Sequence, residues 1–220
     1  IGSLNNGCSN PKSKRSRSMK IVVIGAGGDV GRAVADELAR DKKHEVIRVG
    51  RTSGDHQVDI TRDESVSALF ETIGPVDAII VAAGNVILAP IEKMTAAEFH
   101  HGLQDKLLSQ VRVALVGQHY LSDRGSITLT SGIAVDDPIA QGANAATSNA
   151  GIEGFVRAAA CDFPRSIRIN AVSPTVLTES VGRFGPFFPG CESVPAARVA
   201  MAYRRSVEGV HSGRVYRVGH

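Results

Sequence analysis

The sequence predicts a single α/β domain in which helices cover both faces of a doubly wound, seven-stranded parallel sheet. From Lys20 onward, short apolar runs alternate with longer segments of helical period, which is typical of parallel strands joined by crossover helices. A chain of 220 residues that is 43% hydrophobic and 21% charged can form one globular core. The apolar runs are all shorter than the ~20 residues of a membrane span, so no membrane partner is expected.

The apolar runs and their spacing define the expected elements. We expect strands at residues 20–24, 45–49, 57–60, 76–82, 126–130, 167–172 and 214–218. We expect helices at residues 30–41, 62–73, 95–121, 144–163 and 195–208. Only residues 51–56 separate the second and third strands, which is too short for a helical crossover. Either a compact loop replaces the helix there, or the third strand is vestigial.

Charge is unevenly distributed along the chain. Of 25 basic and 22 acidic residues, residues 1–18 hold four basic and no acidic ones, so the domain at 19–220 is nearly neutral. That domain is therefore not expected to bind nucleic acid. The leader at 1–18 is expected to be disordered, and is either an artificial or upstream extension or a transit or nuclear signal. Three widely spaced cysteines indicate reduced thiols and a cytoplasmic location.

Three glycines lie between the first strand and an amphipathic helix. Gly25 permits a tight turn, Gly28 lets the backbone approach a pyrophosphate, and Gly31 allows close packing of the helix. The N-terminus of that helix would present free N–H groups and a positive dipole end to the anion. This context predicts a Rossmann-type dinucleotide site. Asp29 is expected to be the N-cap, with its carboxylate turned away from the phosphates.

The end of the second strand indicates which dinucleotide binds. An acidic residue there suits the free ribose 2′-OH of NAD, whereas arginine and hydroxyl groups suit a 2′-phosphate. Here the chain has Arg51, Thr52 and Ser53. The sequence therefore favours NADP(H) over NAD(H), the alternative being that Arg51 is a solvated turn residue.

With these features in order, nearly all of 19–220 resembles the short-chain dehydrogenase/reductase family. Further landmarks are the segments GSITLTSG (125–132) and RINAVSPTVLT (168–178). The resemblance implies an adenine contact by Asp59 and Ile60, and a turn under the cofactor at Ala83 and Gly84. It also implies that Thr130 lies beside the cofactor and that Pro174 and Val176 line the nicotinamide.

The catalytic pattern of that family is altered here. Its members usually reduce a carbonyl with hydride from the nicotinamide, while a Tyr, its pKa lowered by a Lys four residues on, donates the proton. The resemblance puts Ala145 at the Tyr position and Asn149 at the Lys position. It puts Gly132 at the position of the family's Ser, with Ser131 one place early, and Lys106 where an Asn is expected. A non-standard proton route is therefore implied.

Three residues remain as catalytic candidates. In an apolar cleft, desolvation would lower the pKa of Lys106 so that it exchanges protons near neutral pH; otherwise it is a surface residue or a partner of an acidic neighbour. Ser131 is expected to orient a substrate oxygen, and Asn149 to hydrogen-bond the nicotinamide ribose. His, Cys and carboxylate spacing indicates no metal site.

An aromatic loop precedes the last helix. Phe184, Phe187 and Phe188 are interspersed with glycines and prolines, which predicts an apolar lid over a small-molecule substrate; the alternative is a cover for the core or for a subunit interface. The resemblance also implies a homodimer or homotetramer.

Together these features predict an NADP(H)-dependent oxidoreductase that acts on a small, fairly apolar carbonyl or enone. Two alternatives stay open: a non-catalytic NADP(H) sensor or partner-binding protein, and a non-redox isomerase or lyase.

Overall fold

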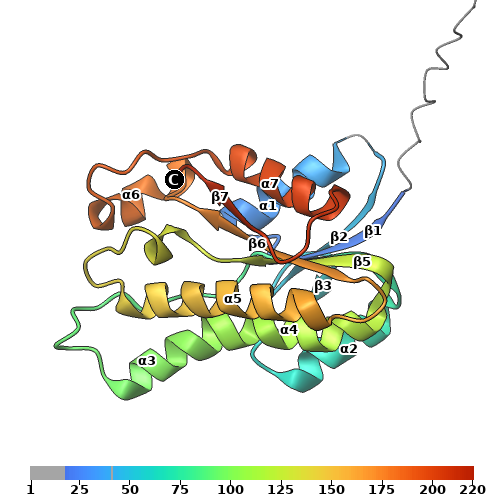
Figure 1. Ribbon diagram of the computed structural model, residues 1–220, viewed down its shortest axis with the longest axis horizontal. Coiled ribbons are helices and arrows are strands. Elements are labelled where there is room, and N and C mark those ends of the chain that lie inside the picture. Colours follow the sequence, from blue (N-terminus) through green and yellow to red (C-terminus); the bar gives the residue numbers. More distant parts are fainter. Residues whose placement is uncertain (1–17, 41) are drawn as a thin grey trace, which may run out of the picture.

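A computed structural model describes residues 18–40 and 42–220, so the expected leader lies almost wholly outside the described residues. The chain forms one parallel sheet with the strand order β3-β2-β1-β4-β5-β6-β7 (Figure 1). It runs outward from β1 to β3, returns to β4 beside β1, and continues outward to β7. This is the predicted doubly wound fold.

The strands are β1 (Lys20–Ile24), β2 (Glu45–Gly50), β3 (His56–Gln57), β4 (Val76–Val81), β5 (Leu121–Thr130), β6 (Arg168–Pro174) and β7 (Val215–Val218). The α-helices are α1 (Asp29–Ala39), α2 (Asp63–Ile73), α3 (Ala96–Leu103), α4 (Ser109–Gly117), α5 (Ala143–Asp162), α6 (Val181–Phe184) and α7 (Ala196–Glu208). A π-helical turn, η1 (Gln104–Leu108), joins α3 to α4. The 3₁₀ turns are η2 (Gln118–Tyr120), η3 (Ile133–Val135), η4 (Thr178–Ser180) and η5 (Gly185–Phe187).

Helices cover both faces of the sheet. Helices α1 and α7 lie on one face, and α2, α4 and α5 lie on the other (Figure 1). Successive residues of β1 alternate between the two layers, so that Ile21 and Val23 pack toward α1 and α7 while Val22 and Ile24 pack toward the opposite core. Burial on both faces explains why the central strands are continuous apolar runs.

The third strand is shorter than predicted. It is only His56–Gln57, paired with Val49 and Gly50 of β2, rather than residues 57–60. The Asp59 carboxylate accepts hydrogen bonds from the Thr61 N–H (3.0 Å) and hydroxyl (2.6 Å), and this local turn ends the pairing with β2. Both features expected of the short 51–56 segment are therefore present, a loop in place of a helix and a vestigial strand.

The predicted helix at 95–121 is neither uniform nor that long. It begins as expected, because Thr95 and Glu98 form a capping box. It then passes through the π-helical turn at Gln104–Leu108, and β5 already starts at Leu121. Sequence periodicity does not register the single extra residue of a π turn, so the prediction missed it.

The carboxyl ends of the strands define one edge of the molecule. The loop after β5 and helix α6, which follows β6, lie together at the left of Figure 1. Strand order reverses between β1 and β4, and parallel α/β folds bind ligands at such a switch point. The site should therefore lie at this edge.

Candidate active site

The three predicted glycines have different structural roles. Gly25 has φ +89°, and a Cβ there would lie 2.4 Å from the Ala82 carbonyl oxygen. A Cβ on Gly31 would lie 2.1 Å from the Gly25 oxygen. At Gly28, by contrast, the nearest atom would be at 3.6 Å, an ordinary contact. The protein's own packing therefore requires Gly25 and Gly31, whereas it leaves room for a Cβ at Gly28.

Helix α1 begins at this opening without a side-chain cap. The N-cap is Gly28, in extended conformation, so the prediction of Asp29 as N-cap is wrong: Asp29 is already the first helical residue. Its carboxylate accepts hydrogen bonds from Arg32 (3.0 Å) and from the Ser180 hydroxyl (3.2 Å). The backbone N–H groups of the first turn thus keep no side-chain acceptor, which suits a phosphate.

The segment after β2 lies against the glycine turn. A Cβ on Gly27 would approach the Ser53 hydroxyl oxygen to 3.3 Å. The Gln57 side chain donates a hydrogen bond to the backbone carbonyl of Thr52, so this bond does not involve the Thr52 hydroxyl. Arg51 is 63% exposed in its side chain, and its guanidinium lies 3.7 Å from an Asp105 oxygen. Of the three candidate 2′-phosphate ligands, Ser53 lies beside the glycine turn, and Arg51 is exposed with its guanidinium near Asp105.

The residues expected around the adenine and under the cofactor lie in several different places. Asp59 lies beyond β3, where hydrogen bonds from Thr61 hold the pKa of its carboxyl below the usual value. Ile60 follows it and is buried in the core. Ala83 lies beside Gly25 at the end of β4. Gly84 instead belongs to an inner pocket.

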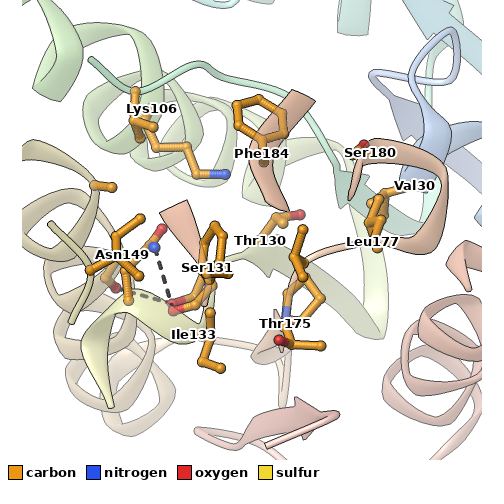
Figure 2. A pocket seen from close by; sticks show the side chains of 18 of the residues that line it. Val30, Lys106, Thr130, Ser131, Ile133, Asn149, Thr175, Leu177, Ser180 and Phe184 are labelled. Atoms are coloured by element: carbon orange, nitrogen blue, oxygen red, sulfur yellow. Dashed lines mark hydrogen bonds between the residues drawn. The ribbon is translucent and has the colours of Figure 1, made fainter. Parts of the chain in front are cut away.

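That inner pocket has a volume of about 260 Å³ and opens at the carboxyl ends of β5 and β6 (Figure 2). Its walls are mostly apolar. The sequence candidates that line it are Gly84, Lys106, Thr130, Ser131, Asn149, Pro174 and Val176. Val30, in the first turn of α1, also lines it and connects it to the glycine turn.

Lys106 points into this pocket (Figure 2). The residue is 9% exposed, and within the described residues no hydrogen bond or ion pair engages its ammonium group. Burial lowers the pKa of Lys106 to about 8, opposed by the negative charge of Asp105. Lys106 is therefore buried in an apolar cleft rather than on the surface, and Asp105 acts on it through its charge without an ion pair to its ammonium.

Ser131 and Asn149 lie beside each other in the pocket (Figure 2). The Ser131 hydroxyl donates a hydrogen bond to a Glu153 carboxylate oxygen (3.0 Å), and it lies 3.4 Å from the backbone carbonyl oxygen of Asn149. The Asn149 side-chain nitrogen lies 3.4 Å from the Gly132 carbonyl, while its buried Oδ1 has no hydrogen-bond partner among the described residues. Ala145, one turn earlier on α5, also lines the pocket and offers no proton.

Thr130 offers the pocket no free polar atom. Its hydroxyl contacts the Val81 carbonyl (2.5 Å) and the Tyr203 hydroxyl (2.6 Å), and its backbone N–H and C=O are both bonded to the Gln110 amide. Its hydroxyl proton and backbone N–H are thus already engaged within the protein. Gln110 and Glu153 were missed by sequence reasoning. Glu153 had a signal, since it lies four residues after Asn149 and four before its partner Arg157, on one helix face.

The predicted lid is only partly over the pocket. Phe184 and Phe188 line the pocket. Phe187 does not, and it lines a separate hollow between residues 186–191 and the segment 137–141. The Ser180 hydroxyl, also a lining group, bonds to Asp29 and so ties this loop to the glycine turn.

Two further expectations concern metals and membranes. Among residues 18–40 and 42–220, no three His, Cys, Asp or Glu side chains gather as metal ligands. Within the same residues, no helix combines the length and apolar character needed to cross a bilayer.

The sheet order, the glycine turn and a pocket at the carboxyl ends of the strands define a Rossmann-type α/β fold. Residues 20–210 match the family model described as "Enoyl-(Acyl carrier protein) reductase". The chain belongs to the short-chain dehydrogenase/reductase family.

Relatives and solved structures agree with this assignment. The protein lin1944 from Listeria innocua is 46% identical, with a TM-score of 0.88 over 91% of this chain and 100% of that one. A small-chain dehydrogenase in complex with NADPH is 28% identical, with a TM-score of 0.81 over 91% and 96% of the two chains. Hydroxynaphthalene reductase arp2 of Aspergillus fumigatus is 27% identical over 78% of this chain and 71% of its own. L-xylulose reductase of Mesocricetus auratus is 24% identical over 91% and 89%.

Proposed function

We propose that the protein is an NADP(H)-dependent oxidoreductase that reduces a small, apolar carbonyl or enone, with Lys106 in place of the family's tyrosine as proton donor. The observation that carries this proposal is the continuity of two sites. The open N-terminus of α1 at Gly28 leads through Val30 into the pocket that contains the Lys106 ammonium. A dinucleotide bound along this path would have its pyrophosphate at the helix and its nicotinamide beside Lys106.

The chain's own groups fit such a cofactor. The space beside Gly28 would hold the pyrophosphate, and the exposed Arg51 would meet a 2′-phosphate. The unpartnered Asn149 Oδ1 would accept a hydrogen bond from a ribose hydroxyl. Pro174 and Val176 would form an apolar wall for the nicotinamide. When bound, NADPH supplies the hydride.

Proton transfer then depends on the protein. In this proposal the Lys106 ammonium would stabilise negative charge on the substrate oxygen and donate a proton to it. The apolar walls, including Phe184 and Phe188, keep water away from the reacting atoms. Ser131 is held by Glu153 and would orient the substrate rather than lose a proton.

The relatives support the cofactor and the substrate class. NADPH is bound by one structural relative, and two relatives are reductases, one of a hydroxynaphthalene and one of a sugar. The mostly apolar pocket favours an aromatic or aliphatic compound over a sugar, which would leave many hydroxyl groups unpaired.

A two-stage experiment tests this function. NADPH binding is measured by fluorescence, and bound NADPH is then mixed with a panel of carbonyl and enone compounds in single-turnover reactions. Oxidation of NADPH by panel members is the expected result. Tight binding without any oxidation would instead favour the NADP(H) sensor, and conversion of a compound without NADPH oxidation would favour an isomerase or lyase.

Replacing Arg51 tests the 2′-phosphate assignment. Arg51→Ala is expected to weaken NADPH binding about 10- to 100-fold, the value of a charge-assisted hydrogen bond, and to leave NADH binding unchanged. Fluorescence titrations with both nucleotides measure this, and Arg198→Ala on the exposed side of α7 is the matched control. Equal weakening of both nucleotides would refute the assignment.

A further inference from the structure

Lys106 is the only ionisable residue among those that line the pocket. The other lining groups are apolar side chains, glycines, hydroxyls and the Asn149 amide. A buried ammonium without a counter-ion is costly, and proteins normally pair such a charge. Among the described residues only the charge of Asp105 acts on this ammonium, and no hydrogen bond or ion pair engages it.

Asp105, whose charge acts on Lys106, and Glu153, which lies behind Ser131, both have other contacts. One Asp105 oxygen accepts hydrogen bonds from Asn85, at 3.0 Å from the side chain and 3.3 Å from the backbone, and the other faces Arg51 at 3.7 Å. Glu153 accepts from Ser131 and pairs with Arg157 at 2.9 Å. Neither carboxylate lines the pocket. Since no carboxylate among the described residues forms an ion pair with the Lys106 ammonium, a ligand can supply the anion that contacts it.

The local fold holds Lys106 in this position. The residue lies in the π-helical turn Gln104–Leu108, and its backbone carbonyl accepts a hydrogen bond from the Gln110 side chain (3.0 Å). A Cβ on Gly84, which has φ +104°, would lie 2.9 Å from Lys106 Cα and 3.3 Å from its Cδ. The absence of a side chain at Gly84 thus leaves room for the Lys106 side chain, which points into the pocket.

We infer that the pocket binds a small apolar molecule that carries one anionic oxygen group, with that oxygen on Lys106 Nζ. The inference rests on the proposed function only in taking this ligand as the substrate. A carboxylate next to the reacting carbonyl, or an enolate or phenolate conjugated with it, would supply the charge. The apolar walls would enclose the rest of the molecule, as they do in most small-molecule sites.

Paired probes test the anion directly, without cofactor. By calorimetry, 3-phenylpropanoate is expected to bind at least about tenfold more tightly than 3-phenylpropanamide, which has the same shape without the charge. A second arm uses 4-nitrophenol, whose absorbance reports whether the bound form is the phenolate. Binding of only one of the two anions would identify the source as carboxylate or phenolate.

Variants then assign the anion to one atom. Lys106→Met is expected to abolish the preference for 3-phenylpropanoate over its amide, and Lys106→Arg to retain it. Lys93→Met, an exposed lysine on the loop before α3, is the control. If Lys106→Met does not fold, the pH dependence of the wild-type protein serves instead. Affinity for the carboxylate should fall as the pH rises past about 8, where Lys106 loses its proton, while affinity for the amide stays constant.

Equal affinities for the acid and the amide, or an unchanged preference in Lys106→Met, would overturn the inference. NADPH titration of the same preparations keeps this result separate from the proposed function. Loss of anion selectivity with intact NADPH binding and oxidation would contradict only the anion site, whereas anion binding without any NADPH binding would contradict only the oxidoreductase.

Discussion

Replacing Lys106 by methionine is expected to slow the oxidation of bound NADPH by about 10²- to 10⁴-fold, the usual contribution of a positioned general acid. Methionine fills similar volume in the apolar pocket but has no proton to give, and Ala145 and Thr130 offer none in its place. NADPH affinity should stay the same, because the pyrophosphate and 2′-phosphate contacts lie elsewhere. Single-turnover kinetics at saturating substrate and fluorescence titration measure the two quantities separately.

The pH dependence provides a second measure of the same role. The proton donor is the ammonium form, which is present below the pKa of Lys106, about 8, and is lost above it. The wild-type rate should therefore fall as the pH rises through about 8. The residual rate of Lys106→Met should lack this step, and Lys93→Met should behave as wild type. A Lys106→Met rate within a few-fold of wild type would contradict the assignment.

Gly31→Ala is expected to destabilise the protein by about 1–3 kcal/mol, the usual cost of inserting a methyl group into packed space. Within a helix, alanine normally stabilises relative to glycine by about 1 kcal/mol. Here the added Cβ would lie 2.1 Å from the Gly25 oxygen and 2.9 Å from the Ala26 nitrogen. Both are backbone atoms of the turn, so the clash can be relieved only by moving α1 away from β1. Urea unfolding measures the free energy of unfolding.

Gly154 in α5 is the matched control for that substitution. It is exposed, and a Cβ there would meet nothing within 4 Å. Gly154→Ala should therefore stabilise the protein by about 0.5–1 kcal/mol. Because α1 carries the pyrophosphate position, Gly31→Ala should also weaken NADPH binding, and Gly154→Ala should not. Equal effects of the two substitutions on stability would show that the close packing of α1 against the turn is not required.

The fold class could be predicted from sequence patterns that do not require knowledge of the tertiary structure. Alternation of apolar runs with helical periods depends on which faces are buried, so it predicted the sheet, its crossovers and the glycine turn. The boundaries of helices and strands that depend on local hydrogen bonds were predicted less well. Asp59 ends β3 through bonds to Thr61, and Gly28 takes the N-cap that Asp29 was expected to occupy. Such choices depend on local geometry that composition does not encode.

From the sequence, the resemblance also implied Ala145 and Asn149 at the positions of the family's Tyr and Lys, and it singled out Lys106 as the most informative replacement. Only the tertiary structure decided how deeply each candidate site residue is buried and which hydrogen-bond partners it has. Lys106 is a buried, unpaired charge because a π turn and Gly84 direct it into an apolar pocket. The polar groups of Thr130 are engaged in hydrogen bonds with residues that are distant in sequence, namely Gln110, Tyr203 and Val81. Burial and hydrogen-bond partners arise from contacts between segments far apart along the chain, and those contacts exist only once the sheet has formed.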